Sequence, residues 1–156
     1  MQISFLNYFL ASIASYLGLL VGAILIKLAP EEQKSGRKYF IFLKMLLFFL
    51  IIALLLLSYK VNAIFSLALL IFIIILMLHG KLHLEKSSLV YLLFGIIFYL
   101  SSKNNNLFAL QSALMFLYGI PNSSLVINPK KNNYREIFAR NLWFFVPIML
   151  LYWLKI

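Results

Sequence analysis

Uninterrupted apolar runs constrain this chain more than any other feature. The stretch FFLIIALLLL at residues 48–57 contains no polar side chain, and it does not alternate as the strands of a membrane barrel do. Several runs approach or exceed about 18 residues, the length that crosses a bilayer as a helix. Because lipid offers no partner to an unpaired backbone group, we expect an all-α integral membrane protein.

The overall composition indicates the same class. Hydrophobic residues make up 64% of the chain and charged residues 12%, whereas soluble domains are about 45–50% apolar and about 25% charged. The chain has no cysteine, which excludes disulfides, thiolate ligands and a cysteine nucleophile. The first basic residue is Lys27, so we expect no cleavable signal peptide.

Polar breaks divide the chain into one polytopic membrane domain over residues 1–156. We expect a compact bundle of about six transmembrane helices with short loops, so that consecutive helices are antiparallel neighbours. The predicted spans are 3–28, 38–58, 62–79, 88–102, 107–127 and 137–155.

The basic residues predict the orientation of these spans. Most of the 14 Lys and Arg residues fall in loops one, three and five or beside them. By the positive-inside rule these loops face inward and both termini lie outside, at a cell membrane or an organelle inner membrane. Anionic lipid headgroups attract such residues by about 1 kcal/mol each, so the net charge of +10 requires no nucleic-acid partner. The inner-face residues expected to contact lipids or a partner are Arg37, Lys38, Lys130, Lys131, Arg135 and Arg140.

The first loop, KLAPEEQKSGRKYF at residues 27–40, holds two of the four acidic residues, Glu31 and Glu32. Pro30 followed by acidic residues suits the start of a short helix, and Gly36 is expected to end it in a left-handed cap. We interpret this loop as an interfacial turn. The alternative is a docking or catalytic pair of carboxylates, although exposed pairs are poor indicators of function.

Small residues recur along one face of the first span, where they let another backbone approach closely. The fifth span offers a matching surface, whereas the second span has almost no small residue and is expected to face lipid. We expect the first and fifth spans to form the packing centre, or the first span to dimerise. The predicted helix-packing residues are Ala11, Ala14, Gly18, Gly22, Ala109, Ser112, Ala113 and Gly119.

The fifth span contains Gly119 and Pro121, which are expected to kink or end the helix. Asn122, Ser123 and Ser124 follow directly. Transporters build binding sites from broken helices lined by hydroxyls and amides. A binding or permeation role for Pro121, Asn122, Ser123 and Ser124 therefore competes with an ordinary helix end near the inner interface.

His79 and His83 lie four residues apart, with Glu85 close behind, and are the candidate metal ligands of the chain. Two histidines without a third ligand at a set spacing are a weak metal signal, so we expect no metal and no cofactor. An interfacial histidine pair is the favoured interpretation. The chain has no Asp for a Ser–His–Asp triad, and no charged residue lies at the centre of a predicted span, which argues against an ion-coupled pump.

These features favour a non-catalytic membrane protein with a structural or assembly role. It would act as a homo-oligomer or as a small subunit of a larger membrane complex, with membrane lipids and other subunits as partners. The alternative is a passive channel or small-solute transporter that uses the broken fifth span. The third hypothesis is an enzyme that acts on membrane lipids at the inner interface through His79, His83, Glu85 and Arg140.

Overall fold

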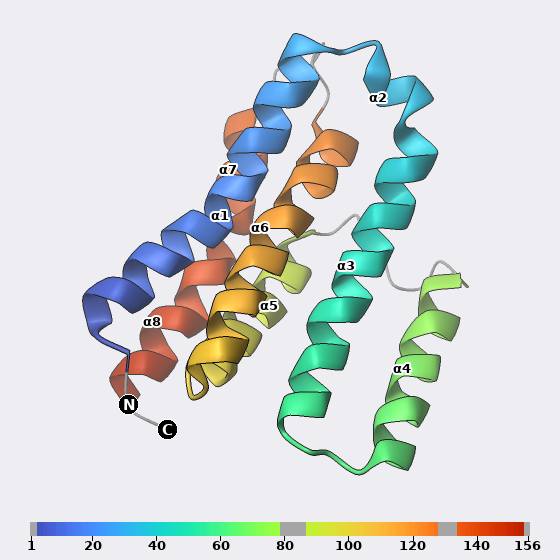
Figure 1. Cartoon of the computed structure of the whole chain (residues 1–156). Coiled ribbons are helices and arrows are strands. Elements are labelled where there is room, and N and C mark those ends of the chain that lie inside the picture. Colours follow the sequence, from blue (N-terminus) through green and yellow to red (C-terminus); the bar gives the residue numbers. More distant parts are fainter. Residues whose placement is uncertain (1–2, 79–86, 128–133, 155–156) are drawn as a thin grey trace.

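The computed structural model describes residues 3–78, 87–127 and 134–154, and the structural statements below refer to these residues (Figure 1). The fold is all-α, as predicted. Five residues singled out in the sequence lie outside the described ranges: His79, His83, Glu85, Lys130 and Lys131. In chain order the elements are α1 (Phe5–Leu28), α2 (Glu32–Ser35), α3 (Arg37–Ser58), α4 (Ala63–Leu78), α5 (Ser87–Ser101), α6 (Asn105–Val126), α7 (Tyr134–Asn141), the 3-10 segment η1 (Leu142–Phe144) and α8 (Phe145–Leu154).

Three helical stretches within the described residues are long and apolar enough to cross a membrane. They are Phe5–Leu28, Arg37–Ser58 and Arg135–Leu154. α4 and α5 are apolar but shorter, with 16 and 15 residues. α6 has 22 residues, but it is not one of the three stretches, because its polar side chains lower its mean hydropathy. The chain is therefore a helical bundle with three candidate membrane spans.

α6 occupies the centre of the bundle, between α1 and α3 (Figure 1). α5 packs against η1 and α8, and α4 lies at the edge beside α3. The core between α5 and α6 is aromatic. The ring centroids of Phe94 and Tyr118 are 4.7 Å apart, and those of Phe98 and Phe108 are 4.9 Å apart. Such tilted ring pairs add stabilisation beyond the area that they bury.

Side-chain caps determine where the two most closely packed helices begin. The hydroxyl of Ser4 accepts a hydrogen bond from the backbone N–H of Asn7 at 3.4 Å, at the start of α1. The side-chain oxygen of Asn104 accepts from the N–H groups of Asn106 at 3.1 Å and Leu107 at 3.4 Å. These caps satisfy donors that the first turn of a helix leaves unpaired.

The second span does not simply face lipid, contrary to the prediction. α3 buries Leu47, Phe48 and Ile51 on one side and packs against α6. The side-chain amide of Gln111 in α6 donates a hydrogen bond to the backbone oxygen of Ile51 at 2.8 Å. The prediction omitted this one-sided contact because it took small residues as the mark of a helix contact, whereas large side chains spaced three to four apart also interlock. The opposite side of α3 is exposed, as at Phe42 and Leu46.

The last predicted span, 137–155, is interrupted in the structure. The 3-10 segment η1 separates α7 from α8, and Pro147 lies in the first turns of α8. Proline has no N–H to offer the carbonyl four residues earlier, which favours a local change of helix type. Gly95 of α5 lies against this point, because a Cβ atom there would collide with the backbone oxygen of Phe144 and the ring of Pro147.

Gly36 does not form the predicted left-handed cap. Its φ of −80° and ψ of −7° are right-handed. The N–H of Gly36 donates to the oxygen of Glu32 at 2.7 Å, and the N–H of Phe40 donates to the oxygen of Gly36 at 3.0 Å. These hydrogen bonds connect α2 to α3 through a residue with right-handed backbone angles, so no left-handed residue is needed between the two helices.

Candidate functional site

The close contact between α1 and α6 is made by glycine residues. A Cβ atom on Gly119 would lie 2.6 Å from the backbone of Gly18 and Leu19. A Cβ atom on Gly18 would collide with the carbonyl group of Phe116, and one on Gly22 with that of Ile120. Only residues without a side chain let the two backbones approach this closely.

Some of the other predicted packing residues take part in the α1–α6 contact, and others are exposed on the surface of the bundle. Ser15 and Ser112 meet across the helix pair, because the Ser15 hydroxyl donates to the backbone oxygen of Ser112 at 3.1 Å. Ala11 is half-buried, whereas Ala14, Ala109 and Ala113 are exposed. The buried face of α1 is centred on positions such as Ser15, Leu19, Gly22 and Ile26, and Ala14 falls beside that face.

α6 does not break at Gly119 and Pro121, which corrects the predicted interruption of the fifth span. The helix continues to Val126. Beyond the proline, the Ser123 hydroxyl donates to the oxygen of Gly119 at 3.0 Å and the Ser124 hydroxyl to that of Ile120 at 2.9 Å. These hydroxyls add bonds to carbonyls in the turn around the proline, whereas the carbonyl of Leu117 is the one that loses its N–H partner at Pro121.

Asn122, Ser123 and Ser124 are all buried, and Asn122 is 0% exposed. Its side-chain amide lies beside the hydroxyl of Tyr91 on α5. Neither atom of that amide makes a well-formed hydrogen bond to another described residue, and neither do the hydroxyls of Tyr91 and Tyr118. The rings of these two tyrosines are 6.2 Å apart, so α5 and α6 carry this polar group together. We name Asn122, Tyr91 and Tyr118 the interior polar cluster.

Lys44 also belongs to this site, although its place near the start of the predicted span 38–58 counts it among the cations that flank the first loop. It is only 5% exposed, and its amine lies 5.9 Å from the ring centroid of Tyr118. An ionisable side chain in the interior of a membrane bundle indicates a functional site by default. The spacing of Lys44 to Leu47, Phe48 and Ile51 places it on the buried face of α3, and that periodicity was the available signal.

A side chain of α2, from the first loop, bonds the end of α6 that follows the interior polar cluster. The side-chain amide of Gln33 donates to the backbone oxygens of Ser124 and Ile127, at 2.7 Å each. Gln33 thereby caps the last carbonyls of α6, which have no partner within the helix. A small apolar cluster lies at the same end and consists of Ala23, Ile26, Ile127 and Ile137.

The predicted inner-face cations that the structure describes lie on two elements. Arg37 and Lys38 are exposed in the first turn of α3, and Arg135 is exposed on α7, where Arg140 is half-buried. The start of α3, α7 and the end of α6 lie toward the same end of the bundle (Figure 1). This placement leaves a headgroup-binding role for these cations as a prediction.

Among the described residues, no three His, Asp or Glu side chains gather where they could hold a metal ion. The metal and lipid-enzyme hypotheses depend on His79, His83 and Glu85, which lie outside those residues. Comparison of the chain with protein-family models, with curated proteins and with solved structures gives no match. The interior polar cluster with Lys44 is therefore the strongest candidate site in the described part of the chain.

Proposed function

We propose that this chain is an integral membrane protein that binds a small polar solute at the interior polar cluster and lets it cross the bilayer. One observation carries the proposal: the amide of Asn122 and the hydroxyl of Tyr91 are buried side by side, and the hydroxyl of Tyr118 is buried near them without a well-formed hydrogen bond to a described residue. Each such atom costs about 1–3 kcal/mol when it stays unpaired. Water or a polar solute in this interior would remove that cost.

The chemistry of the cluster fits a small solute that both donates and accepts hydrogen bonds. An amide offers two donors and an acceptor, and each tyrosine hydroxyl offers both roles. Lys44 adds a cationic group beside Tyr118. Gln33 and the apolar cluster around Ile26 and Ile127 lie at one end of α6, and the proposal takes this end to be the one that must open to let the solute pass.

The proposal uses a topology of about six spans with both termini outside. The start of α1 and the end of α8 lie at the same end of the bundle, and the rings of Phe5 and Tyr152 are 5.2 Å apart (Figure 1). An even number of crossings returns the chain to the side where it began. In this topology α4, α5 and α6 supply the further crossings, and α6 is shielded from lipid by its neighbours.

Osmotic swelling of proteoliposomes tests the proposal, with urea and glycerol as the probes. We expect wild-type protein to raise the permeability to at least one probe about tenfold above that of protein-free liposomes. Asn122→Leu removes the central amide and should abolish the increase. Ala109→Leu, an exposed position on the same helix, should leave it unchanged. Permeability to both probes at the protein-free level, or an active Asn122→Leu variant, would contradict the proposal.

A structural or assembly role is the second candidate, and α4 is the observation that favours it. The glycines of α1 face α6 within the chain, so they are not available to a second copy. α4 contacts chiefly α3, and it exposes Ile64 by 79% and Phe65 by 61%. Light scattering in mild detergent tests this role. A defined oligomer that the double change Ile64→Ala and Phe65→Ala converts to a monomer supports it, and a wild-type monomer contradicts it.

A further inference from the structure

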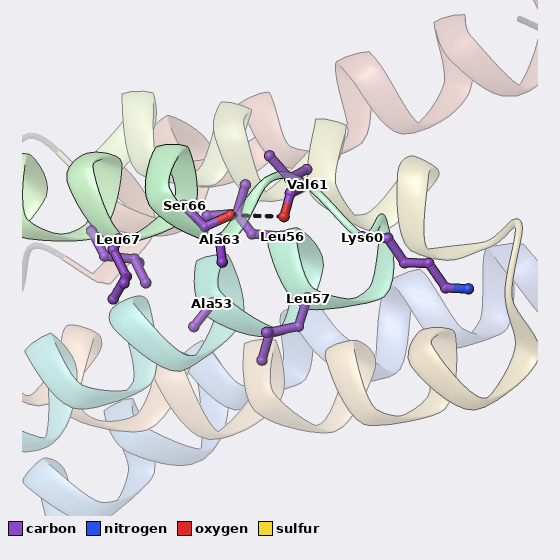
Figure 2. Close-up of a pocket in the computed structure, with 9 residues that line it drawn as sticks. Ala53, Leu56, Leu57, Lys60, Val61, Ala63, Ser66 and Leu67 are labelled. Carbon is purple, nitrogen blue, oxygen red and sulfur yellow. Dashed lines mark hydrogen bonds between the residues drawn. The ribbon is translucent and has the colours of Figure 1, made fainter.

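The hairpin of α3 and α4 contains a groove that is separate from the interior polar cluster. Its volume is about 240 Å³, below the roughly 300–1,000 Å³ of common small-molecule pockets. Figure 2 shows the lining residues along both helices, with Lys60 at the turn that joins them. The lining consists of Ala53, Leu56, Leu57, Lys60, Val61, Ala63, Ser66, Leu67 and Leu70.

The groove exists because α4 packs loosely on α3. Ala53 and Ala63 face the space with short side chains, and Leu67 remains 60% exposed beside them. Apart from Lys60 at the turn, Ser66 is the one lining residue that is not aliphatic, and its hydroxyl is turned to the backbone oxygen of Val61 at 3.5 Å. A narrow slot that is aliphatic along most of its length fits an alkyl chain better than a hydrophilic ligand.

The end of the groove is positively charged. Lys60 is exposed and extends beyond the aliphatic residues in Figure 2. The hydroxyl of Tyr59 donates to the backbone oxygen of Leu100 at 2.9 Å, which joins this turn to the α5–α6 turn that carries Lys103. Of the basic residues on the predicted outer side, Lys60 therefore lines the groove, and Lys103 lies on the turn that the Tyr59 hydrogen bond joins to it.

We propose that the groove binds one acyl chain of an anionic phospholipid, with the headgroup phosphate at Lys60. An aliphatic slot that ends at a cation complements a lipid whose chain ends at an anionic headgroup. The site lies on a different helix pair from the interior polar cluster. It shares with the proposed function only the premise that the chain resides in a bilayer.

Native mass spectrometry of the full chain in detergent tests this site, with dioleoyl phosphatidylglycerol and dioleoyl phosphatidylcholine as the probes. The two lipids have the same chains, so any difference in binding reports the headgroup. We expect one phosphatidylglycerol per protein, with a dissociation constant at least about tenfold below that of phosphatidylcholine. Lys60→Asn should abolish this preference and leave the weaker binding of both lipids.

Asparagine is the suitable replacement, because Lys60 has a φ of +50° and asparagine tolerates the left-handed region. Lys34→Gln removes one exposed charge from α2, outside the cations expected to contact headgroups, and serves as the matched control, with the preference unchanged. Ala53→Phe fills the slot and should abolish binding of both lipids. A wild-type chain that binds the two lipids equally, or a Lys60→Asn variant that keeps the preference, would overturn the proposal. A dimer that Ala53→Phe dissociates would assign the slot to a second copy and overturn it as well.

Discussion

The α1–α6 pair and the α3–α4 pair pack in opposite ways. In the first, Gly18 and Gly119 bring two backbones together, and polar side chains such as Ser15 are buried beside them. In the second, aliphatic side chains leave a groove, and Leu67 is largely exposed. The comparison shows that apolar character alone does not produce a tight helix contact. A tight contact requires complementary helix surfaces, and polar side chains can be buried where two backbones approach closely.

The largest effect should come from filling the α1–α6 contact. Gly18→Leu places a side chain against the carbonyl of Phe116, and the backbone of α6 cannot move aside as a side chain can. We expect a loss of about 3 kcal/mol in the free energy of unfolding. Unfolding in mixed detergent micelles, followed by circular dichroism, measures it. Ala14→Leu, one turn earlier and exposed, is the control and should stay within about 0.5 kcal/mol of wild type.

The same substitution in both pairs tests the comparison directly. Leu19→Ala removes a side chain that is 0% exposed in α1 and should cost about 2 kcal/mol through the cavity it leaves. Leu67→Ala in α4 removes one that is 60% exposed and should cost less than about 1 kcal/mol. The same unfolding measurement applies to both variants. Equal losses would show that the two pairs are packed alike.

A smaller effect is expected at the end of α6. Gln33→Ala removes the donor that bonds the oxygens of Ser124 and Ile127. Each neutral hydrogen bond contributes about 0.5–1.5 kcal/mol net, and both bonds are only part-buried, so the unfolding free energy should fall by about 1 kcal/mol. Gln33→Glu should lower it further, because its carboxylate would face two carbonyl oxygens at the negative end of α6. A Gln33→Ala variant as stable as wild type would show that the amide donor is not required.

Helix positions followed closely from the sequence. The predicted span 3–28 corresponds to Phe5–Leu28 and the span 38–58 to Arg37–Ser58, because long apolar runs between polar breaks determine both. The all-α class is confirmed, whereas the number of membrane crossings stays a prediction. Polar breaks and caps locate these helix ends to within about two residues, because both act through neighbours in the sequence.

The candidate site could be predicted only in part. Asn122, Ser123 and Ser124 stand out as polar residues in an apolar chain, but their burial in a continuous α6 depends on its packing against α1. Lys44 was assigned to the loop flank because its burial depends on which face α3 turns toward α6. Tyr91 and Tyr118 lie on separate helices, and nothing local in the sequence shows that their rings meet.

The most direct test of the central claim is whether water reaches Asn122. The chain has no cysteine, so Asn122→Cys gives a single thiol. A thiol reacts quickly with a charged methanethiosulfonate only where water allows the thiolate to form. Exposed Lys34→Cys in α2 and Leu50→Cys on the outer face of α3 are the controls in permeabilised membrane vesicles. We predict labelling of Asn122→Cys within about tenfold of the Lys34→Cys rate. Labelling as slow as that of Leu50→Cys would contradict a solute-binding interior.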